Sequence, residues 1–240
     1  GGIEAAKILH QMGIGTDYEL FTSYYSKTLK DKDGNPLEVF LNDEGQEQAA
    51  YAGVYMAANG KIRINLNAYS GTKGLTLNAL SHELTHFIKT WSLEKYEAMA
   101  EFLVKSYGEN GVSMNDLVLK EQARLKGIRG KEVSYSEAYD EVVANAFNRM
   151  LEDGKVMERI AEIRQFDNSL ANKIIAGIKK FISRFFNVYR ENQSLFKETE
   201  ALMEMKEVFE QLQNMFAEAL VDASDNFQAY LVAKEAGLDI

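Results

Sequence analysis

The sequence predicts an α+β fold that is mostly helical, with a small antiparallel sheet followed by long amphipathic helices. Proline occurs once in 240 residues, at Pro36, against a typical frequency of about 5%. The convincing β-prone runs lie between residues 37 and 66. From Ser70 onwards, apolar residues recur at spacings of three and four, which is the period of a helix.

The first 36 residues are predicted to form two helices and a turn. Residues 3–12 are expected to be a short helix that stops at a glycine. Thr16 and Glu19 match the capping box Thr-x-x-Glu, so a second helix is expected over residues 16–30. The sequence Asp-Gly-Asn-Pro at residues 33–36 is typical of a turn.

The predicted sheet begins at residues 37–41, where apolar and polar residues alternate. Residues 53–58 and 62–66 flank the dipeptide Asn59-Gly60, a strong signal for a two-residue hairpin turn of type I′. If strand 62–66 is an exposed edge, a peptide could pair with it as an added strand.

The remainder of the chain is predicted to be helical. The expected helices cover residues 73–90, 92–107, 113–126, 134–152, 156–185, 202–219 and 224–236. In the first of these, Leu80, Leu84, Phe87 and Ile88 mark a buried face. A boundary is expected near Asp153, which would separate residues 1–153 from a helical hairpin or bundle formed by residues 154–240.

Composition excludes several classes of function. The formal net charge is -9, so nucleic acid is not an expected partner, because binding to phosphates needs a basic surface. The chain has no cysteine, which excludes disulfides, thiolate metal sites and cysteine nucleophiles. No apolar run reaches the roughly 18 residues of a membrane span. The basic and aromatic stretch 174–190 could lie on an anionic membrane surface, but packing against a neighbouring helix is the usual role of such a stripe.

The segment 81–86 reads Ser-His-Glu-Leu-Thr-His and contains the pattern His-Glu-x-x-His. Residues four apart lie on one face of a helix, so His82 and His86 could together bind one zinc ion. Glu83 follows the first ligand and can act as general base on the water that the metal activates. The chain has only three histidines, and two of them belong to this motif.

A zinc site of this kind needs a third protein ligand. His10 lies far upstream, and no histidine follows the motif in a Gly-x-x-His continuation, which excludes the metzincin pattern. A carboxylate must therefore serve. The predicted helix 134–152 offers Glu137, Asp140 and Glu141.

The motif 82–86, followed by Glu-Val-Val-Ala-Asn-Ala-Phe at residues 141–147, resembles the ImmA/IrrE-type metallopeptidases. The resemblance covers roughly residues 62–151. In that family a Glu-x-x-Ala-Asn-x-Phe helix supplies the third ligand, which implies that Glu141 binds the metal. Such domains also occur inside large polyproteins of phages and conjugative elements. The chain begins Gly-Gly-Ile without a methionine, so we expect it to be a piece of a longer polypeptide.

An alternative register, similar to the thermolysin-like arrangement, makes Glu137 the ligand and Glu141 its supporting carboxylate. Asn145, one turn after Glu141, could orient a zinc-binding histidine through its side-chain carbonyl. Tyr135 and Tyr139 are candidate donors to the oxyanion that develops during hydrolysis. Asn65 and Asn67 on the predicted hairpin could line the cleft.

These observations predict a zinc-dependent metalloendopeptidase of the zincin kind, with its catalytic domain in residues 1–153 and the sheet lying over the metal-binding helix. Its substrate would be a protein or peptide, and its expected location is cytoplasmic. A partner could also bind through the C-terminal helices. The alternative is a helical interaction module in which the zinc site is structural or decayed.

Overall fold

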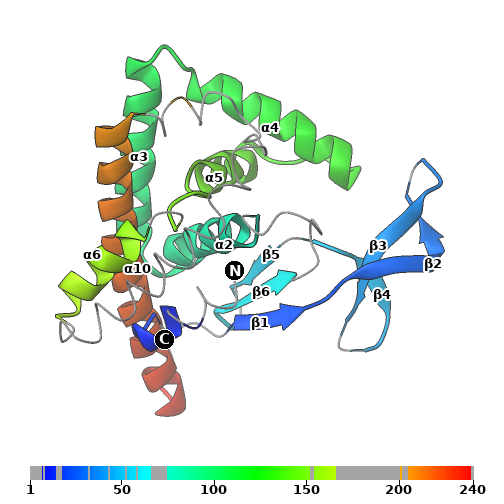
Figure 1. Cartoon of the computed structure of the whole chain (residues 1–240), viewed down its shortest axis with the longest axis horizontal. Helices are drawn as coiled ribbons and strands as arrows, with labels where there is room; N and C mark the ends of the chain where they lie inside the picture. Colours follow the sequence, from blue (N-terminus) through cyan, green and yellow to red (C-terminus); the bar gives the residue numbers. More distant parts are fainter. Residues whose placement is uncertain are drawn as a thin grey trace.

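The computed structural model describes residues 7, 9–14, 18–31, 33–42, 44–51, 53–57, 59–65, 75–151, 154–165, 201 and 205–238. These residues form a mixed α+β structure in which the helices pack together and two three-stranded sheets lie to one side (Figure 1). The basic stretch 174–190 and residues 3–6 of the helix expected over residues 3–12 lie outside the described residues, whereas residues 7 and 9–11 are helical as expected.

The first sheet, which we call sheet A, lies against the helix that carries His82 and His86. It contains β1 (Tyr18–Phe21), β5 (Gly53–Met56) and β6 (Lys61–Asn65) in the order β1-β6-β5. The β5 and β6 strands are antiparallel, whereas β1 runs parallel to β6, so the prediction of a purely antiparallel sheet is wrong. The condition for peptide pairing at residues 62–66, an exposed edge, is not met, because β6 is the central strand.

The hairpin of β5 and β6 is confirmed, but its turn is longer than predicted. Met56 pairs with Lys61, so a four-residue loop joins the strands. Gly60 has a φ of 67°, whereas Asn59 does not have a positive φ, which contradicts a type I′ turn. Glycine fits at this position for a second reason, since a Cβ on Gly60 would lie 2.3 Å from the ring of Phe227.

The prediction of a helix over residues 16–30 is wrong, because the described part of this segment forms β1 and β2 (Tyr24–Lys30). The segment is rich in aromatic residues, which favour strands. A capping box contributes only about 1 kcal/mol, and pairing along β6 outweighs it. The side chain of Ser26 accepts from the backbone N–H groups of Thr28 and Leu29, where the register of β2 shifts.

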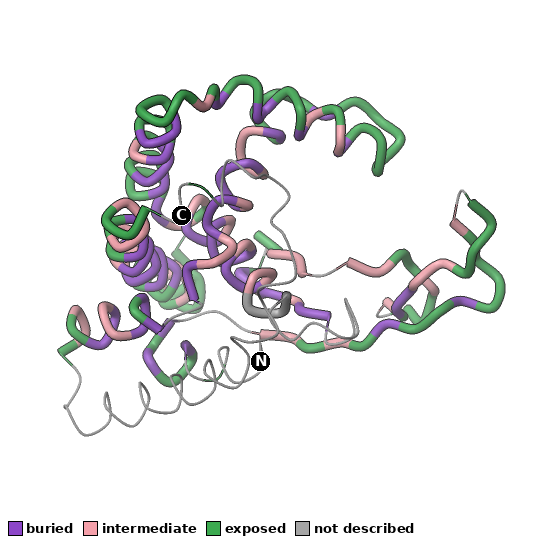
Figure 2. The backbone as a smooth tube through the Cα atoms, turned by 45° about the horizontal axis from the view of Figure 1, so that its top comes forward, coloured by how far each residue is buried: buried purple, intermediate pink, exposed green. Residues whose placement is uncertain are grey.

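The second sheet, sheet B, contains β2, β3 (Pro36–Leu41) and β4 (Glu47–Ala49) in that order, all antiparallel. The predicted strand 37–41 and the turn before it are confirmed. Sheet B projects away from the helices and is mostly exposed (Figures 1 and 2). Where sheet B meets sheet A, the ring of Phe40 packs against two aromatic rings. Its centroid lies 4.9 Å from that of Phe21 and 5.0 Å from that of Tyr51.

The four central helices lie close to their predicted positions: α2 (Leu75–Trp91), α3 (Leu93–Glu109), α4 (Met114–Arg129) and α5 (Tyr135–Ala146). Ser113 and Ser134 cap α4 and α5 by accepting from backbone N–H groups. The α5 helix ends at Ala146 and not near residue 152, because Phe147 and Met150 turn back into the core and are fully buried.

The last two described helices differ from the prediction. The α6 helix (Lys155–Ile163) stops well before residue 185, and the turn after it includes Gln165, with a φ of 50°. The α10 helix (Lys206–Glu235) is continuous, where two helices were predicted. It stays intact at Ser224 because that side chain is buried and its hydroxyl donates to the carbonyl of Gly13 at 2.8 Å.

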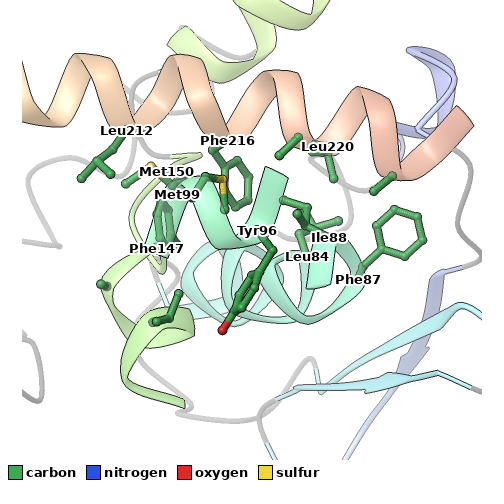
Figure 3. Packing of buried hydrophobic residues seen from close by; sticks show 14 of the residues in the cluster. Leu84, Phe87, Ile88, Tyr96, Met99, Phe147, Met150, Leu212, Phe216 and Leu220 are labelled. Carbon is green, nitrogen blue, oxygen red and sulfur yellow. The ribbon is translucent and has the colours of Figure 1, made fainter. Parts of the chain in front are cut away.

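One hydrophobic core joins these helices. Leu84 and Ile88 of α2 lie under α10, whose Phe216 stacks on Phe147 with centroids 5.9 Å apart (Figure 3). The core thus fixes one face of α2 and leaves the opposite face turned towards α5 and β5. The division of the chain at residue 153 stays a prediction. In the described part of the chain, no helix is both long and apolar enough to cross a membrane.

Candidate metal centre

The α2 helix brings the two histidines of the motif together. His82 and His86 are one turn apart, and their Nε2 atoms lie 3.2 Å from each other. Leu84 and Phe87, between and beside them in sequence, are fully buried in the core. The burial of these apolar residues fixes the rotation of α2, so both imidazoles point away from the core.

The α5 helix supplies the carboxylate that completes the group. Glu141 places Oε2 3.4 Å from Nε2 of His82, and the ligand atoms of His82, His86 and Glu141 all lie within 4.8 Å of one another. Two ligands of a tetrahedral zinc ion, each about 2.0–2.1 Å from the metal, are separated by about 3.3 Å. The three side chains could therefore hold a metal ion.

The charges of this group are strongly coupled. Burial lowers the pKa of His82, but the hydrogen bond to Glu141 and the charges of nearby carboxylates outweigh burial and raise it above the usual value. Burial and the neighbouring His82 lower the pKa of His86 to about 4. Burial raises the pKa of Glu141, but His82 overcomes this effect and brings it to about 2. Without metal, the charged form of His82 and the ionised form of Glu141 therefore stabilise each other.

Glu83 lies on the other side of the histidines, between α2 and the edge strand β5. Its side chain is buried, and burial raises the pKa of the carboxyl to about 7. The charge of His82 and a hydrogen bond from the backbone of Tyr55 act in the opposite direction. Gly53 makes room for this carboxylate, because a Cβ there would lie 3.0 Å from Cγ of Glu83. Glu83 is thus held beside the ligand group and is not part of it.

Two further charged residues lie around Glu141, and no pattern in the sequence predicts the first of them. Arg129, at the end of α4, pairs with Glu137 and lies 3.5 Å from Oε1 of Glu141. Asp140 pairs with Lys89 of α2 and accepts from the buried Tyr96 hydroxyl at 2.9 Å. Of the three carboxylates that α5 offers, the structure brings only Glu141 into the group with both histidines.

The remaining candidates are placed as follows. The hydroxyl of Tyr135 donates to Asn115 at 3.2 Å, and Tyr139 packs against the hydrophobic core. Asn65 is buried and donates to Ser23 at 2.9 Å. His10 is exposed near the start of the chain, away from the motif, and Asn67 lies outside the described residues.

Asn145 follows Glu141 by one turn of α5. Its side-chain nitrogen is buried and has no hydrogen-bond partner among the described residues. A buried amide without a partner costs free energy. Whether it orients a histidine stays a prediction.

Comparisons with known proteins add no further support for the site. No protein-family model matches the sequence, and no curated protein and no solved structure is found to match the chain. The resemblance to the ImmA/IrrE-type metallopeptidases therefore stays a prediction.

Proposed function

We propose that the chain is a zinc-dependent metalloendopeptidase of the zincin kind. The observation that carries the proposal is the convergence of His82, His86 and Glu141 within 4.8 Å, with the buried Glu83 beside them. Three protein ligands leave one position of a tetrahedral metal open, as in catalytic zinc sites. A structural site usually has four protein ligands, so this arrangement favours an enzyme over the alternative of an interaction module.

Zinc is the metal that suits these donors best. Two imidazole nitrogens and one carboxylate oxygen form the donor set of many catalytic zinc sites. The separations of 3.2 Å and 3.4 Å from Nε2 of His82 match two edges of a tetrahedron around zinc. When bound, zinc supplies an acidified water and polarises a substrate carbonyl.

Glu83 is the group that moves protons in this proposal. Its carboxylate takes a proton from the attacking water and returns it to the leaving amine. Burial raises the pKa of the carboxyl, which strengthens Glu83 as a base. The backbone of Tyr55 and the absence of a side chain at Gly53 hold Glu83 in place, so β5 is part of the catalytic arrangement.

Replacing Glu83 by glutamine tests the proposal. This change keeps the size of the side chain but removes the base, so cleavage of a random peptide library should fall about 10²–10⁴-fold. Zinc content, measured by mass spectrometry, should stay that of the wild type, because Glu83 is not a ligand. Glu94→Gln on the exposed surface of α3 is the matched control and should cleave like the wild type. Equal cleavage by E83Q and the wild type would refute a catalytic role for Glu83.

A further inference from the structure

Asp140, which comes directly before Glu141 on α5, is bonded to two other helices. One of its carboxylate oxygens pairs with Nζ of Lys89, near the end of α2. The other accepts from the hydroxyl of Tyr96 on α3 at 2.9 Å. The side chain of Asp140 is 17% exposed, and Tyr96 is buried. Both oxygens of Asp140 are therefore used in contacts that join α5 to α2 and α3.

The two groups that bind Asp140 also contact each other. Nζ of Lys89 lies over the ring of Tyr96, 5.8 Å from its centroid, a distance at which a cation and an aromatic ring attract each other. Tyr96 belongs to the hydrophobic core. Lys89 follows His86 by three residues, which is about one turn of the same helix. Asp140 is thus held by one residue of the core and by one residue of the helix that carries the histidines.

The reach of Glu141 depends on the rotation of α5 about its axis. Its Oε2 lies 3.4 Å from Nε2 of His82. The end of a side chain lies about 6 Å from the axis of its helix, so a rotation of about 20° would move it by about 2 Å. That displacement equals the length of a bond between zinc and its ligand. A metal site that uses Glu141 therefore needs α5 to be fixed in rotation.

Apolar packing by itself fixes rotation less strictly than hydrogen bonds do. Ala138, Val142 and Ala146 hold α5 against the core, but the hydrophobic effect has no preferred direction. The bonds of Asp140 do have one, since a hydrogen bond weakens steeply when its angle departs from linearity. Because Asp140 and Glu141 are neighbours on one helix, a bond that fixes the first also sets the direction of the second.

We infer that Asp140 is a positioning residue for the metal centre, which sets the rotation of α5 through Lys89 and Tyr96 so that Glu141 reaches the histidines. The inference rests on the proposed function, because it takes the histidines and Glu141 to be zinc ligands. It gives the three carboxylates of α5 different tasks. Glu141 binds the metal, Asp140 orients the helix, and Glu137 pairs with Arg129.

Charge offers a competing explanation for Asp140. Burial is the main cause of the lowered pKa of His86, but Asp140 raises this pKa and Lys89 lowers it through their charges. Both charges could therefore also act on a bound cation. The two explanations disagree about Lys89. Removal of its positive charge would strengthen zinc binding if charge were decisive, and would weaken zinc binding if position were decisive.

Three variants, each of which cuts one of these links, test the inference through zinc affinity measured by competition with a chromophoric chelator. Asp140→Asn removes the ion pair but keeps an oxygen for Tyr96, and Lys89→Met and Tyr96→Phe each remove one donor. Each variant should bind zinc about three- to tenfold more weakly, the loss expected for one hydrogen bond. Lys95→Met on the exposed surface of α3 removes the same charge elsewhere and should bind zinc like the wild type.

A double-mutant cycle shows whether Asp140 acts through Glu141. In the background of Glu141→Gln, the change Asp140→Asn should alter zinc affinity less than twofold, because the ligand that it positions is gone. An equal loss in both backgrounds would mean that Asp140 supports the histidines or the fold in general. That result would overturn the inference.

Cobalt(II) in place of zinc gives a readout that a loss of stability would not change. Its visible absorption depends on the number and geometry of its ligands, so at saturating cobalt the spectrum of D140N should move towards that of E141Q. An unchanged spectrum, tighter zinc binding by K89M, or wild-type affinity in all three variants would overturn the inference. These measurements need no substrate. Failure of the proposed function would show separately, as cleavage that does not depend on zinc or on Glu83.

Discussion

Sheets A and B are built from similar β-prone segments, yet they have opposite relations to water. In sheet A, Ile62 and Ile64 are fully buried because α2 packs on this sheet. In sheet B, Tyr25 is 69% exposed and Leu41 is 53% exposed, and the sheet projects away from the helices (Figure 2). The comparison shows that helix cover decides which sheet belongs to the core.

The difference also bears on the candidate site, because, among the described residues, only sheet A packs closely on the helix that carries it. Sheet A packs on α2, and its Gly53 lies so close to Glu83 that the sheet can restrict the position of that carboxylate. Sheet B is accessible and its outer strand is open among the described residues. A rigid support of the kind that sheet A forms would suit the proposed catalytic site.

The largest effect is expected from truncation of the core of sheet A. Ile64→Ala should lower the free energy of unfolding by about 2–5 kcal/mol, because it removes a fully buried side chain. The matched truncation in sheet B, Leu41→Ala, should change it by no more than about 0.5 kcal/mol. Urea unfolding followed by circular dichroism measures both. A loss at Leu41 as large as that at Ile64 would mean that sheet B is covered in solution.

Most of the helical part could be predicted from the sequence, because each helix has a local signal. Leu80, Leu84, Phe87 and Ile88 follow the helical period, and Ser113 and Ser134 are caps. The segment 16–30 could not be predicted correctly, because its partner β6 lies more than 40 residues away along the chain. Pairing between distant segments outweighs a local capping signal, and no local pattern reports it.

The residues of the candidate site also fall into those that a local pattern predicts and those that depend on packing between distant segments. His82, Glu83 and His86 could be chosen because one helix turn holds them together, which is a local property. Glu141 was predicted as the third ligand from a resemblance to a known family. The spacing of residues by itself did not distinguish it from Glu137 and Asp140. The contacts of Gly53 and Arg129 depend on how β5 and α4 pack near α2 and α5, so the sequence contained no pattern that could predict them.

The next largest effect separates the two candidate third ligands on α5. Glu141→Gln should weaken zinc binding by more than about 100-fold, since removal of even a supporting residue costs 10–100-fold. Glu137→Gln should change it less than about tenfold, because Glu137 pairs with Arg129 and is half exposed. Competition with a chromophoric chelator measures both. A larger loss in E137Q would favour the alternative register.

Zinc binding should also depend on pH in a specific way. The raised pKa of His82 means that the metal-free protein keeps a proton there to a higher pH than an ordinary histidine would, and zinc must displace it. His86 and Glu141, with pKa values near 4 and 2, have already lost their protons above about pH 5. Affinity should therefore rise about tenfold per pH unit between pH 5 and the pKa of His82, with release of one proton.

Isothermal titration in buffers of different ionisation enthalpy counts that proton directly. Release of two protons would show that a second group also loses its proton when zinc binds, and the E83Q variant would show whether that group is Glu83, whose pKa is about 7, or His86. The Leu41→Ala variant of sheet B is the control, because it lies far from the ligand group and should release the same number of protons.

The smallest expected effect concerns Gly53, where sheet A touches the proposed catalytic base. The residue has an ordinary negative φ, so a side chain is not excluded by the backbone. A Cβ would nevertheless lie 3.0 Å from Cγ and 3.2 Å from Oε1 of Glu83, and 3.5 Å from Cβ of Ala79. The flexible carboxylate can yield by a few tenths of an ångström more easily than the helix can.

Gly53→Ala should therefore displace Glu83 slightly and leave the histidines in place. A misplacement of about 1 Å at a reacting group can cost 10²-fold, so a shift of a few tenths should reduce kcat about three- to tenfold. Zinc affinity and the free energy of unfolding should stay close to the wild type. Gly108→Ala on α3, where an added Cβ meets nothing within 4 Å, is the matched control and should keep full activity. If G53A and G108A had the same kcat, sheet A would only support α2, and the position of Glu83 would depend on the helix alone.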